Sequence, residues 1–283
     1  MASVGAHQYR CVMTTTGLEV RLHEGRERAE VTRFTKTLDE IVRSLREIDR
    51  VYLMRGTRAT WVMADLRHDH DEMVVRLEAR ASTGARTAED MLVPVMAFVA
   101  GAASLNEVAE IPRLFSPTTV ERLASLAEAK QGVQSVSVAA YNGQVGPRVA
   151  LSDSVREHAR EAVRPFEISY GSISGVLDLV GTSHRQRGMR LSIYDPAGRQ
   201  AVDGFVAERL AEELRLMWRH RVLAGGKIKR NQRGQVIRIE VDRIERLPDD
   251  DRGRPDTDQV LGMAPDWLNG QSVDQYLREV RDG

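Results

Sequence analysis

The sequence predicts an α+β protein: a mixed domain of hairpins and helices over residues 1–167, a small five-stranded β-barrel over 168–248, and a short C-terminal helix. Apolar residues between positions 38 and 48 recur at the spacing of one helix face. Asn142-Gly143 separates two alternating stretches, which is typical of a β-hairpin. After Pro165 the pattern changes to short alternating stretches with a single helical one, which favours a barrel.

The elements of the first domain are assigned from periodicity and capping signals. Thr87, with Glu89 and Asp90 behind it, opens an apolar helix, and Ser116 and Ser152 are N-caps. We expect a strand pair over 9–22 turned near Gly17, strands over 60–67, 73–79, 135–141 and 144–151, and helices over 35–50, 87–103, 117–130 and 153–164.

The second domain is predicted to run in the order β-β-β-α-β-β. The expected strands are 172–179, 189–194, 200–205, 221–229 and 235–246, with a helix over 207–218. Asp195-Pro196-Ala197-Gly198 and the 231–234 segment carry turn residues. The helix therefore falls between the third and fourth strands.

This stretch resembles an OB-fold module. The resemblance is carried by Gly175, by the strand end Ile193-Tyr194-Asp195, by the 207–218 helix and by Val222 with Gly225 and Gly226. Such modules commonly bind single-stranded nucleic acid, and others bind proteins or sugars. Of the aromatic residues that could stack on bases, only Tyr194 and Phe205 are in place, and Phe205 could equally belong to the core.

Charge is unevenly distributed although the 283-residue chain is neutral overall. Residues 168–248 hold 15 basic and 9 acidic side chains, whereas the 35 residues that follow hold 4 basic and 9 acidic. A polarised layout of this kind favours binding rather than catalysis. The predicted barrel loops carry the basic groups, and with Tyr194 they form a candidate nucleic-acid surface: Arg185, Arg187, Tyr194, Lys227, Lys229, Arg230 and Arg233. Ordinary solvated loops, or an acidic linker folded over this face, are the alternatives.

The C-terminal segment divides into an acidic linker, 249–260, and an amphipathic docking segment, 261–283. Ser272 and Gln275 form a capping box that opens the terminal helix. A helix this short is unstable alone in water, so it is expected to dock on its own domain or on another molecule. Its candidate anchors are Trp267, Leu268, Val273, Tyr276, Leu277 and Val280.

The runs Gly262-Met263-Ala264-Pro265-Asp266 and Ser272–Arg278 resemble the C-terminal end of antitoxins that pair with PIN-domain ribonuclease toxins. In such pairs the terminal peptide wraps the toxin, and a charged side chain often reaches its acidic metal site. The resemblance implies a toxin nuclease as protein partner, with Arg278 or Arg281 as the polar contact. It covers some 20 residues, and most such antitoxins are far shorter than this chain.

No catalytic set, metal site or cofactor is predicted. The segment His68-Asp69-His70-Asp71-Glu72 is the one metal-like cluster, and a solvated hairpin turn is its favoured interpretation. Gly171-Ser172-Ile173-Ser174-Gly175 lacks the following helix that a nucleophile elbow needs. Ala224-Gly225-Gly226-Lys227 lacks the spacing of a phosphate loop, and predicts a strand with close backbone approach.

The first functional hypothesis is therefore a non-enzymatic binding protein, such as an antitoxin-like inhibitor, that docks through residues 261–283. The second is an OB-fold protein that binds single-stranded nucleic acid, and an enzyme using residues 68–72 ranks last. The single cysteine, Cys11, excludes a disulfide within the chain and favours a reducing compartment. Since no apolar leader or full-length membrane span is evident, we expect a cytoplasmic protein.

Overall fold

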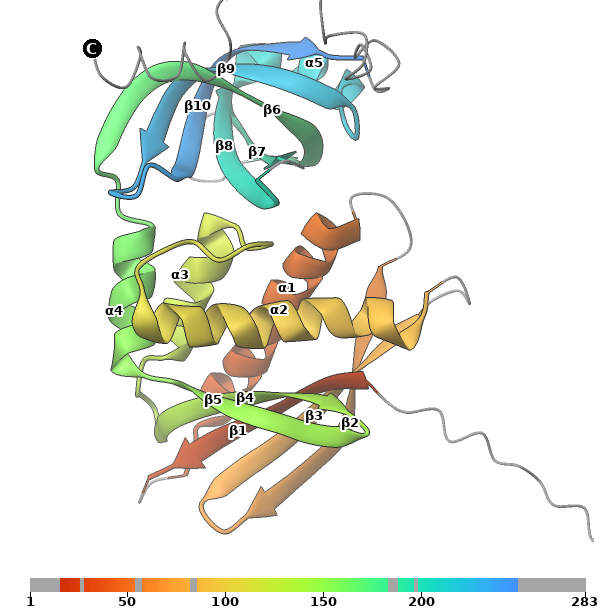
Figure 1. The fold of residues 1–283 in the computed structure, drawn as a ribbon, viewed down its shortest axis with the longest axis vertical. Helices are drawn as coiled ribbons and strands as arrows, with labels where there is room; N and C mark the ends of the chain where they lie inside the picture. Colours follow the sequence, from red (N-terminus) through yellow and green to blue (C-terminus); the bar gives the residue numbers. More distant parts are fainter. Residues whose placement is uncertain are drawn as a thin grey trace, which may run out of the picture. The chain divides into compact units, whose positions relative to one another are not determined.

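A computed structural model describes residues 16–25, 28–53, 58–81, 86–182, 188–195 and 198–248. By its contacts the chain divides into one unit up to Leu247 and a second from Pro248 onward. The fold given below belongs to the first unit (Figure 1). The expected acidic linker, the docking segment and its terminal helix lie outside the described residues.

The first half of the chain forms a five-stranded antiparallel sheet in the order β2-β3-β1-β4-β5. Its strands are β1 (Thr16–Glu24), β2 (Ala59–Asp69), β3 (Glu72–Ala81), β4 (Val133–Asn142) and β5 (Gln144–Leu151). Both predicted hairpins are present, and Gly143 turns the second with a φ of 73°.

Gly17 does not form the turn expected near it. Residues 16–24 are one central strand, and Gly17 pairs with Glu78 on one side and Tyr141 on the other. A Cβ at this position would lie 1.9 Å from the carbonyl oxygen of Leu77. The glycine is therefore needed for close backbone approach inside the sheet; residues 9–15 of the expected strand pair lie outside the described ranges.

Four helices lie on one side of this sheet (Figure 1); three of them pack against its strands, and the third in chain order packs on its helical neighbours. They are α1 (Val31–Leu53), α2 (Ala88–Glu107), α3 (Pro117–Leu126) and α4 (Asp153–Ala162). The two expected N-caps are confirmed, since the side chains of Ser116 and Ser152 each accept a backbone N–H of the first turn. Thr87, predicted as the first residue of its helix, is the N-cap of α2.

Helix α3 ends at Leu126, four residues before the predicted end at 130. The buried Arg33 guanidinium donates to the carbonyl oxygens of Leu126 at 3.4 Å and of Glu128 at 2.8 Å. These bonds satisfy carbonyl groups that a continuing helix would have used. The chain then turns through Gln131 and Gly132, both with positive φ.

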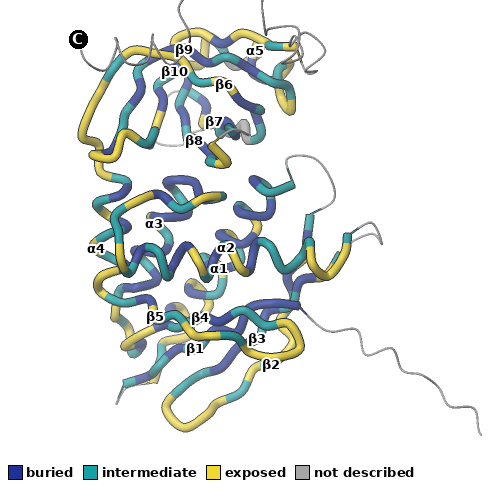
Figure 2. Tube along the Cα trace, viewed as in Figure 1, coloured by how far each residue is buried: buried dark blue, intermediate teal, exposed yellow. Residues whose placement is uncertain are grey.

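The core of this half lies between the sheet and the helices, where Figure 2 shows buried segments of both. Helix α2 contributes Val95, Phe98, Ala102 and Leu105 to it. By length and composition alone α2 could cross a membrane, but core helices pass the same test. Its packing between sheet and helices is compatible with a soluble protein.

The second half forms a closed barrel in the order β10-β8-β7-β6-β9. Its strands are β6 (Glu167–Thr182), β7 (Gly188–Asp195), β8 (Gln200–Ala207), β9 (Arg221–Arg230) and β10 (Val236–Arg246). Strands β8 and β10 pair in parallel, and all other neighbours are antiparallel. A 3-10 turn (Glu208–Leu210) and α5 (Ala211–Leu216) separate β8 from β9. This is the predicted element order, and the closed barrel is compatible with an OB-like fold.

Strand β6 begins at Glu167 instead of 172, so its first five residues were not predicted as strand. The close approach expected at Gly225-Gly226 is confirmed, because a Cβ on Gly226 would lie 2.0 Å from the carbonyl oxygen of Glu240.

The barrel is hydrogen-bonded to the helical half. The side chain of Gln235 accepts from the backbone N–H of Ile111 at 2.9 Å and donates to its carbonyl at 3.0 Å. Asn231 donates to the carbonyl of Ala162 at 2.8 Å. These side-chain hydrogen bonds, to the backbone N–H and carbonyl groups of Ile111 and to the carbonyl of Ala162, hold the β9–β10 hairpin against the first half of the chain.

Candidate nucleic-acid interface

The outward side of β6, β9 and β10 gathers aromatic and basic side chains on one surface. Strand register pairs Ile168 with Lys229 and Tyr170 with Lys227, and side chains of directly paired residues share one side of a sheet. The register between β9 and β10 adds Arg238 opposite Lys229 and Arg243 opposite Gly225. We call this surface the aromatic–basic face, defined by Ile168, Tyr170, Lys227, Lys229, Arg238 and Arg243.

The apolar members of this face are unusually exposed. Tyr170 is 79% exposed and Ile168 54%, and Phe166, two residues before Ile168, is 73% exposed. Figure 2 shows much of the first half of β6 as exposed chain. Large exposed apolar groups gathered at one place mark an interaction surface more often than single ones do.

Alternation places the barrel core on the other side of the same strands. Val222, Ala224 and Ile228 of β9 alternate with the outward lysines and join the barrel core. Ile239 and Val241 of β10 do the same. The period-2 pattern therefore fixes which side chains reach solvent. Gly225 leaves room for the Arg243 side chain, whose Nε would lie 2.7 Å from a Cβ there.

One edge of this face is open among the described strands. Residues 167–176 of β6 pair with β9, whereas the pairing with β7 starts only at Val176. The stretch before Val176 thus has a described partner on one edge alone. Such an edge can lie beside an extended ligand without displacing a strand.

An acidic residue, Glu240, lies within the face and pairs across it with Lys227. Its carboxylate accepts from the Lys229 ammonium at 2.6 Å. The hydrogen bond from Lys229 lowers the pKa of Glu240, and the charge of Lys227 acts in the same direction. Lys229 is therefore partly neutralised, while Lys227, Arg238 and Arg243 set the positive charge of the surface.

The predicted nucleic-acid residues are only partly brought together. Lys227 and Lys229 lie on the face. Arg230 and Arg233 lie at the β9–β10 hairpin, where Arg230 donates to the carbonyl of Gly234 at 2.8 Å and Arg233 lies 3.9 Å from Glu110. Arg185 and Arg187 lie outside the described residues, so the expected convergence of two basic loops is not tested.

Tyr194, the predicted stacking residue, lies elsewhere on the barrel. It is only 7% exposed and packs with Val51, Ala201 and Leu114. Burial raises the pKa of its hydroxyl group. The ring therefore has no free face for a base in this arrangement. Phe205, weighed as either core or stacking residue, is half-buried on β8.

Sequence reasoning missed Phe166, which precedes the face, and four members of the face: Ile168, Tyr170, Arg238 and Arg243. The signal for the first three was the period-2 alternation across Phe166-Glu167-Ile168-Ser169-Tyr170. The predicted boundary between the two domains, after residue 167, divides this stretch. The two arginines were not predicted because β10 shifts register against β9 twice, between Val236 and Arg238 and between Val241 and Arg243.

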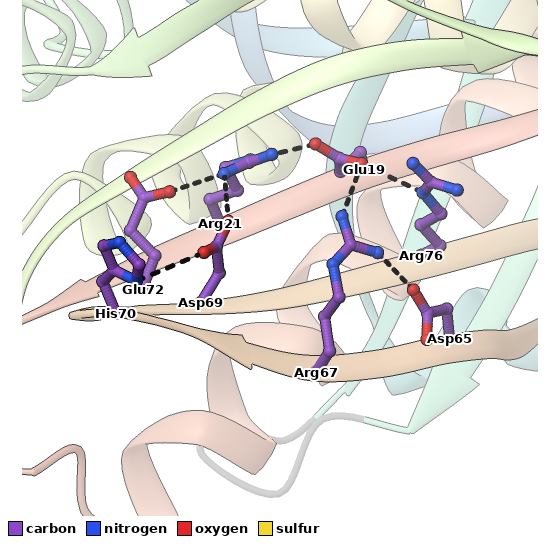
Figure 3. Close-up of polar contacts among 8 residues, drawn as sticks. All are labelled: Glu19, Arg21, Asp65, Arg67, Asp69, His70, Glu72 and Arg76. Atoms are coloured by element: carbon purple, nitrogen blue, oxygen red, sulfur yellow. Dashed lines mark hydrogen bonds and ion pairs between the residues drawn. The ribbon is translucent and has the colours of Figure 1, made fainter.

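The histidine-rich turn 68–72 belongs to a charge network on the open face of the first sheet (Figure 3). Arg21 lies 2.7 Å from Glu72, 3.8 Å from Asp69 and 2.9 Å from Glu19. Arg76 reaches Glu19 at 3.0 Å, and Arg67 bridges Glu19 and Asp65. Across the part of the chain that the structure describes, no group of His, Cys, Asp and Glu is arranged to hold a metal ion.

Glu19 is the centre of this network and is 1% exposed. Burial by itself would raise the pKa of its carboxyl group, but hydrogen bonds from Arg21 and Arg76 outweigh burial and lower it. Arg76 also stacks its guanidinium 4.8 Å from the ring of Tyr141. The network explains how an acidic side chain is tolerated in the central strand, and it leaves its charges satisfied rather than poised for chemistry.

His68 is likewise tied into the structure. Its Nε2 lies 2.7 Å from a carboxylate oxygen of Glu24. The Glu24 carboxylate also accepts from Arg28 and from the backbone N–H of Ala29, at 2.9 Å each. Burial would raise the pKa of Glu24, yet the hydrogen bonds from His68, Ala29 and Arg28 lower it to about 2. These contacts fasten the end of β1 to the segment that enters α1.

No protein-family model matches this chain, and no curated protein matches it. The resemblance of residues 261–283 to antitoxin C-termini therefore gains no support from a family, and those residues lie outside the described part of the chain. The OB-like resemblance is supported by the barrel itself.

Proposed function

We propose that this protein binds single-stranded nucleic acid through the aromatic–basic face, without catalysing a reaction. The observation that carries the proposal is the pairing of Tyr170, a ring 79% exposed, with Lys227 on the neighbouring strand. An exposed ring beside an ammonium group offers one site for a base and one for a phosphate.

The arrangement suits a single strand better than a duplex. Bases of a single strand are free to stack on Tyr170 and Phe166, whereas in a duplex they are already stacked on one another. Lys227, Arg238 and Arg243 extend from β9 to β10 beside the aromatic residues and supply cations for successive phosphates. The open edge of β6 lets an extended chain lie along the barrel.

The test is equilibrium binding of fluorescently labelled 20-nucleotide oligo-dT and oligo-rU by the full-length protein at several salt concentrations. We expect saturable binding. The logarithm of the binding constant should fall linearly with the logarithm of the salt concentration, with a slope of roughly −2 to −3 for three or four neutralised phosphates. A duplex of the same length should bind more weakly. The double variant Lys227→Gln, Lys229→Gln should reduce both the affinity and the slope.

Either of two outcomes would overturn the proposal. The first is the absence of binding at low salt. The second is binding that is indifferent to salt and to the two lysine substitutions. An exposed strand edge with apolar neighbours also suits the addition of a strand from a protein, and salt-insensitive capture of an extended peptide at Tyr170 would assign the face to that class of partner instead.

The antitoxin-like role stays a separate proposal, because it depends on residues 261–283. Its test is co-purification of a nuclease partner with the full-length protein and with the variant Trp267→Ala, Tyr276→Ala. Loss of the partner in the variant would support it, and unchanged recovery would exclude it. A cytoplasmic location suits both roles and follows from them as an expectation.

A further inference from the structure

A pocket of about 610 Å³ lies between α1, α3 and the outward sides of β6, β7 and β8. It shares no lining residue with the aromatic–basic face. Its walls are fastened together, because Thr118 of α3 donates to Asp203 of β8 at 2.5 Å and Val51 of α1 packs with Tyr194 and Ala201. The volume falls in the range of small-molecule sites.

Five arginines line this pocket from both walls. Arg43, Arg46 and Arg50 come from α1, where spacings of three and four residues put them on one side of the helix. Arg122 comes from α3 and Arg190 from β7. The guanidinium groups of two helices and one strand therefore converge on the same space.

Four carboxylates line the pocket as well, but each already has a partner. The pairs are Asp39 with Arg43 at 2.8 Å, Glu47 with Arg122, Asp178 with Arg50 at 3.2 Å, and Asp203 with the hydroxyl of Thr118 at 2.5 Å. Arg122 has a second acidic neighbour in Glu40 at 3.3 Å, and Asp178 a second basic one in Arg58.

Arg46 and Arg190 are the two lining arginines that make no hydrogen bond or ion pair with a residue that the structure describes. Arg190 acts on Asp203 only through its charge. Burial raises the pKa of Asp203. One exposed cation on α1 and one on β7 thus have no partner among the described residues.

We propose that this pocket binds a small phosphate-bearing anion held by Arg46 from one wall and Arg190 from the other. A guanidinium group presents two parallel N–H donors that match two oxygens of a phosphate. Ser192, also in the lining, offers a hydroxyl donor. The pocket shares no residue with the aromatic–basic face, and the nearest link between them is Arg238 of that face, which pairs with Asp203 of the pocket lining.

The experiment measures binding of inorganic phosphate, pyrophosphate and a nucleoside monophosphate to the full-length protein by calorimetry, together with the shift in Tm. We expect saturable binding of at least one of the three and a rise in Tm. The variant Arg46→Gln, Arg190→Gln should bind at least tenfold more weakly. The variant Arg46→Lys, Arg190→Lys should recover only part of the lost affinity, because a lysine lacks the paired donors.

Two control variants distinguish phosphate binding in this pocket from a general effect of positive charge and from the proposed nucleic-acid binding. Arg80→Gln, Arg148→Gln removes two exposed arginines from the first sheet and should leave phosphate binding unchanged. Lys227→Gln, Lys229→Gln should also leave it unchanged. The proposal is overturned if none of the three anions binds, or if the Arg46, Arg190 variant binds as well as the unmodified protein while its circular dichroism is unaltered.

Discussion

Tyr170 of β6 lies directly opposite Lys227 of β9, so that an exposed aromatic ring and an ammonium group share one side of the barrel. Neither residue has an evident part in the barrel core, which is built from the alternate positions of the same strands. A stable barrel does not need an exposed tyrosine at this position, and its exposure supports the proposed interaction surface.

Replacement of Tyr170 by alanine is expected to weaken binding of a single strand about 5- to 150-fold, since stacking of one base contributes about 1–3 kcal/mol. The measurement is the anisotropy of a labelled oligonucleotide at fixed salt. Tyr170→Phe keeps the ring and should stay within about twofold of the unmodified protein. Equal binding by the alanine variant would remove Tyr170 from the site.

Lys227→Gln should change the salt dependence of binding rather than its sequence preference. Loss of one phosphate contact lowers the magnitude of the log–log slope by about 0.7 for a single strand. Lys229→Gln should have the smaller effect on the slope, because Glu240 already engages its ammonium group. If the two variants reverse this order, Glu240 does not screen Lys229 in solution.

Acid is expected to destabilise the fold partly through Glu24. Its pKa is lowered from 4.5 to about 2, so the ionised form stabilises the folded state above about pH 4.5. That contribution is lost progressively as the pH falls from 4.5 toward 2. Thermal unfolding measured between pH 2.5 and 7 should show that Tm falls as the pH is lowered below about 4.5. Glu24→Gln should lower Tm at neutral pH and flatten the fall.

Asp49→Ala should destabilise the protein by about 3–5 kcal/mol, because it leaves the buried Arg86 guanidinium without its carboxylate. Arg86 donates to Asp49 at 2.8 and 3.0 Å, and Asp49 also accepts from the backbone N–H of Ala59 at 2.9 Å. Urea unfolding measures the loss. The double variant Asp49→Ala, Arg86→Met should lose less than the two single variants together, and strict additivity would argue against the pair.

Gly17→Ala is expected to destabilise the central strand by about 1–3 kcal/mol or more, since its Cβ would meet the carbonyl oxygen of Leu77 at 1.9 Å. The matched substitution Gly181→Ala meets nothing within 4 Å and should change stability by less than about 0.5 kcal/mol. Chemical unfolding of both variants tests the difference. A tolerated alanine at position 17 would mean that the sheet opens there without cost.

Local signals were sufficient for most elements. The helix from Thr87, the Asn142-Gly143 hairpin and the order of the five barrel strands depend on contacts within a few residues, and each is present. The failures occurred where distant residues decide. Gly17 looks like a turn in the sequence, but its neighbours Leu77 and Tyr141 make it a close-packed strand residue. The end of α3 is set by Arg33, 93 residues away from Leu126.

The sequence by itself therefore determined the types and order of the elements, because hydrophobic period, caps and turn residues act locally. Only the tertiary structure decided which side chains share a surface. Lys227 lies opposite Tyr170 rather than beside Tyr194, and Arg46 and Arg190 line one pocket, through strand register and helix packing. Register depends on bulges and on pairing between residues far apart in the chain, and a one-residue slip would turn each of these side chains to the opposite side.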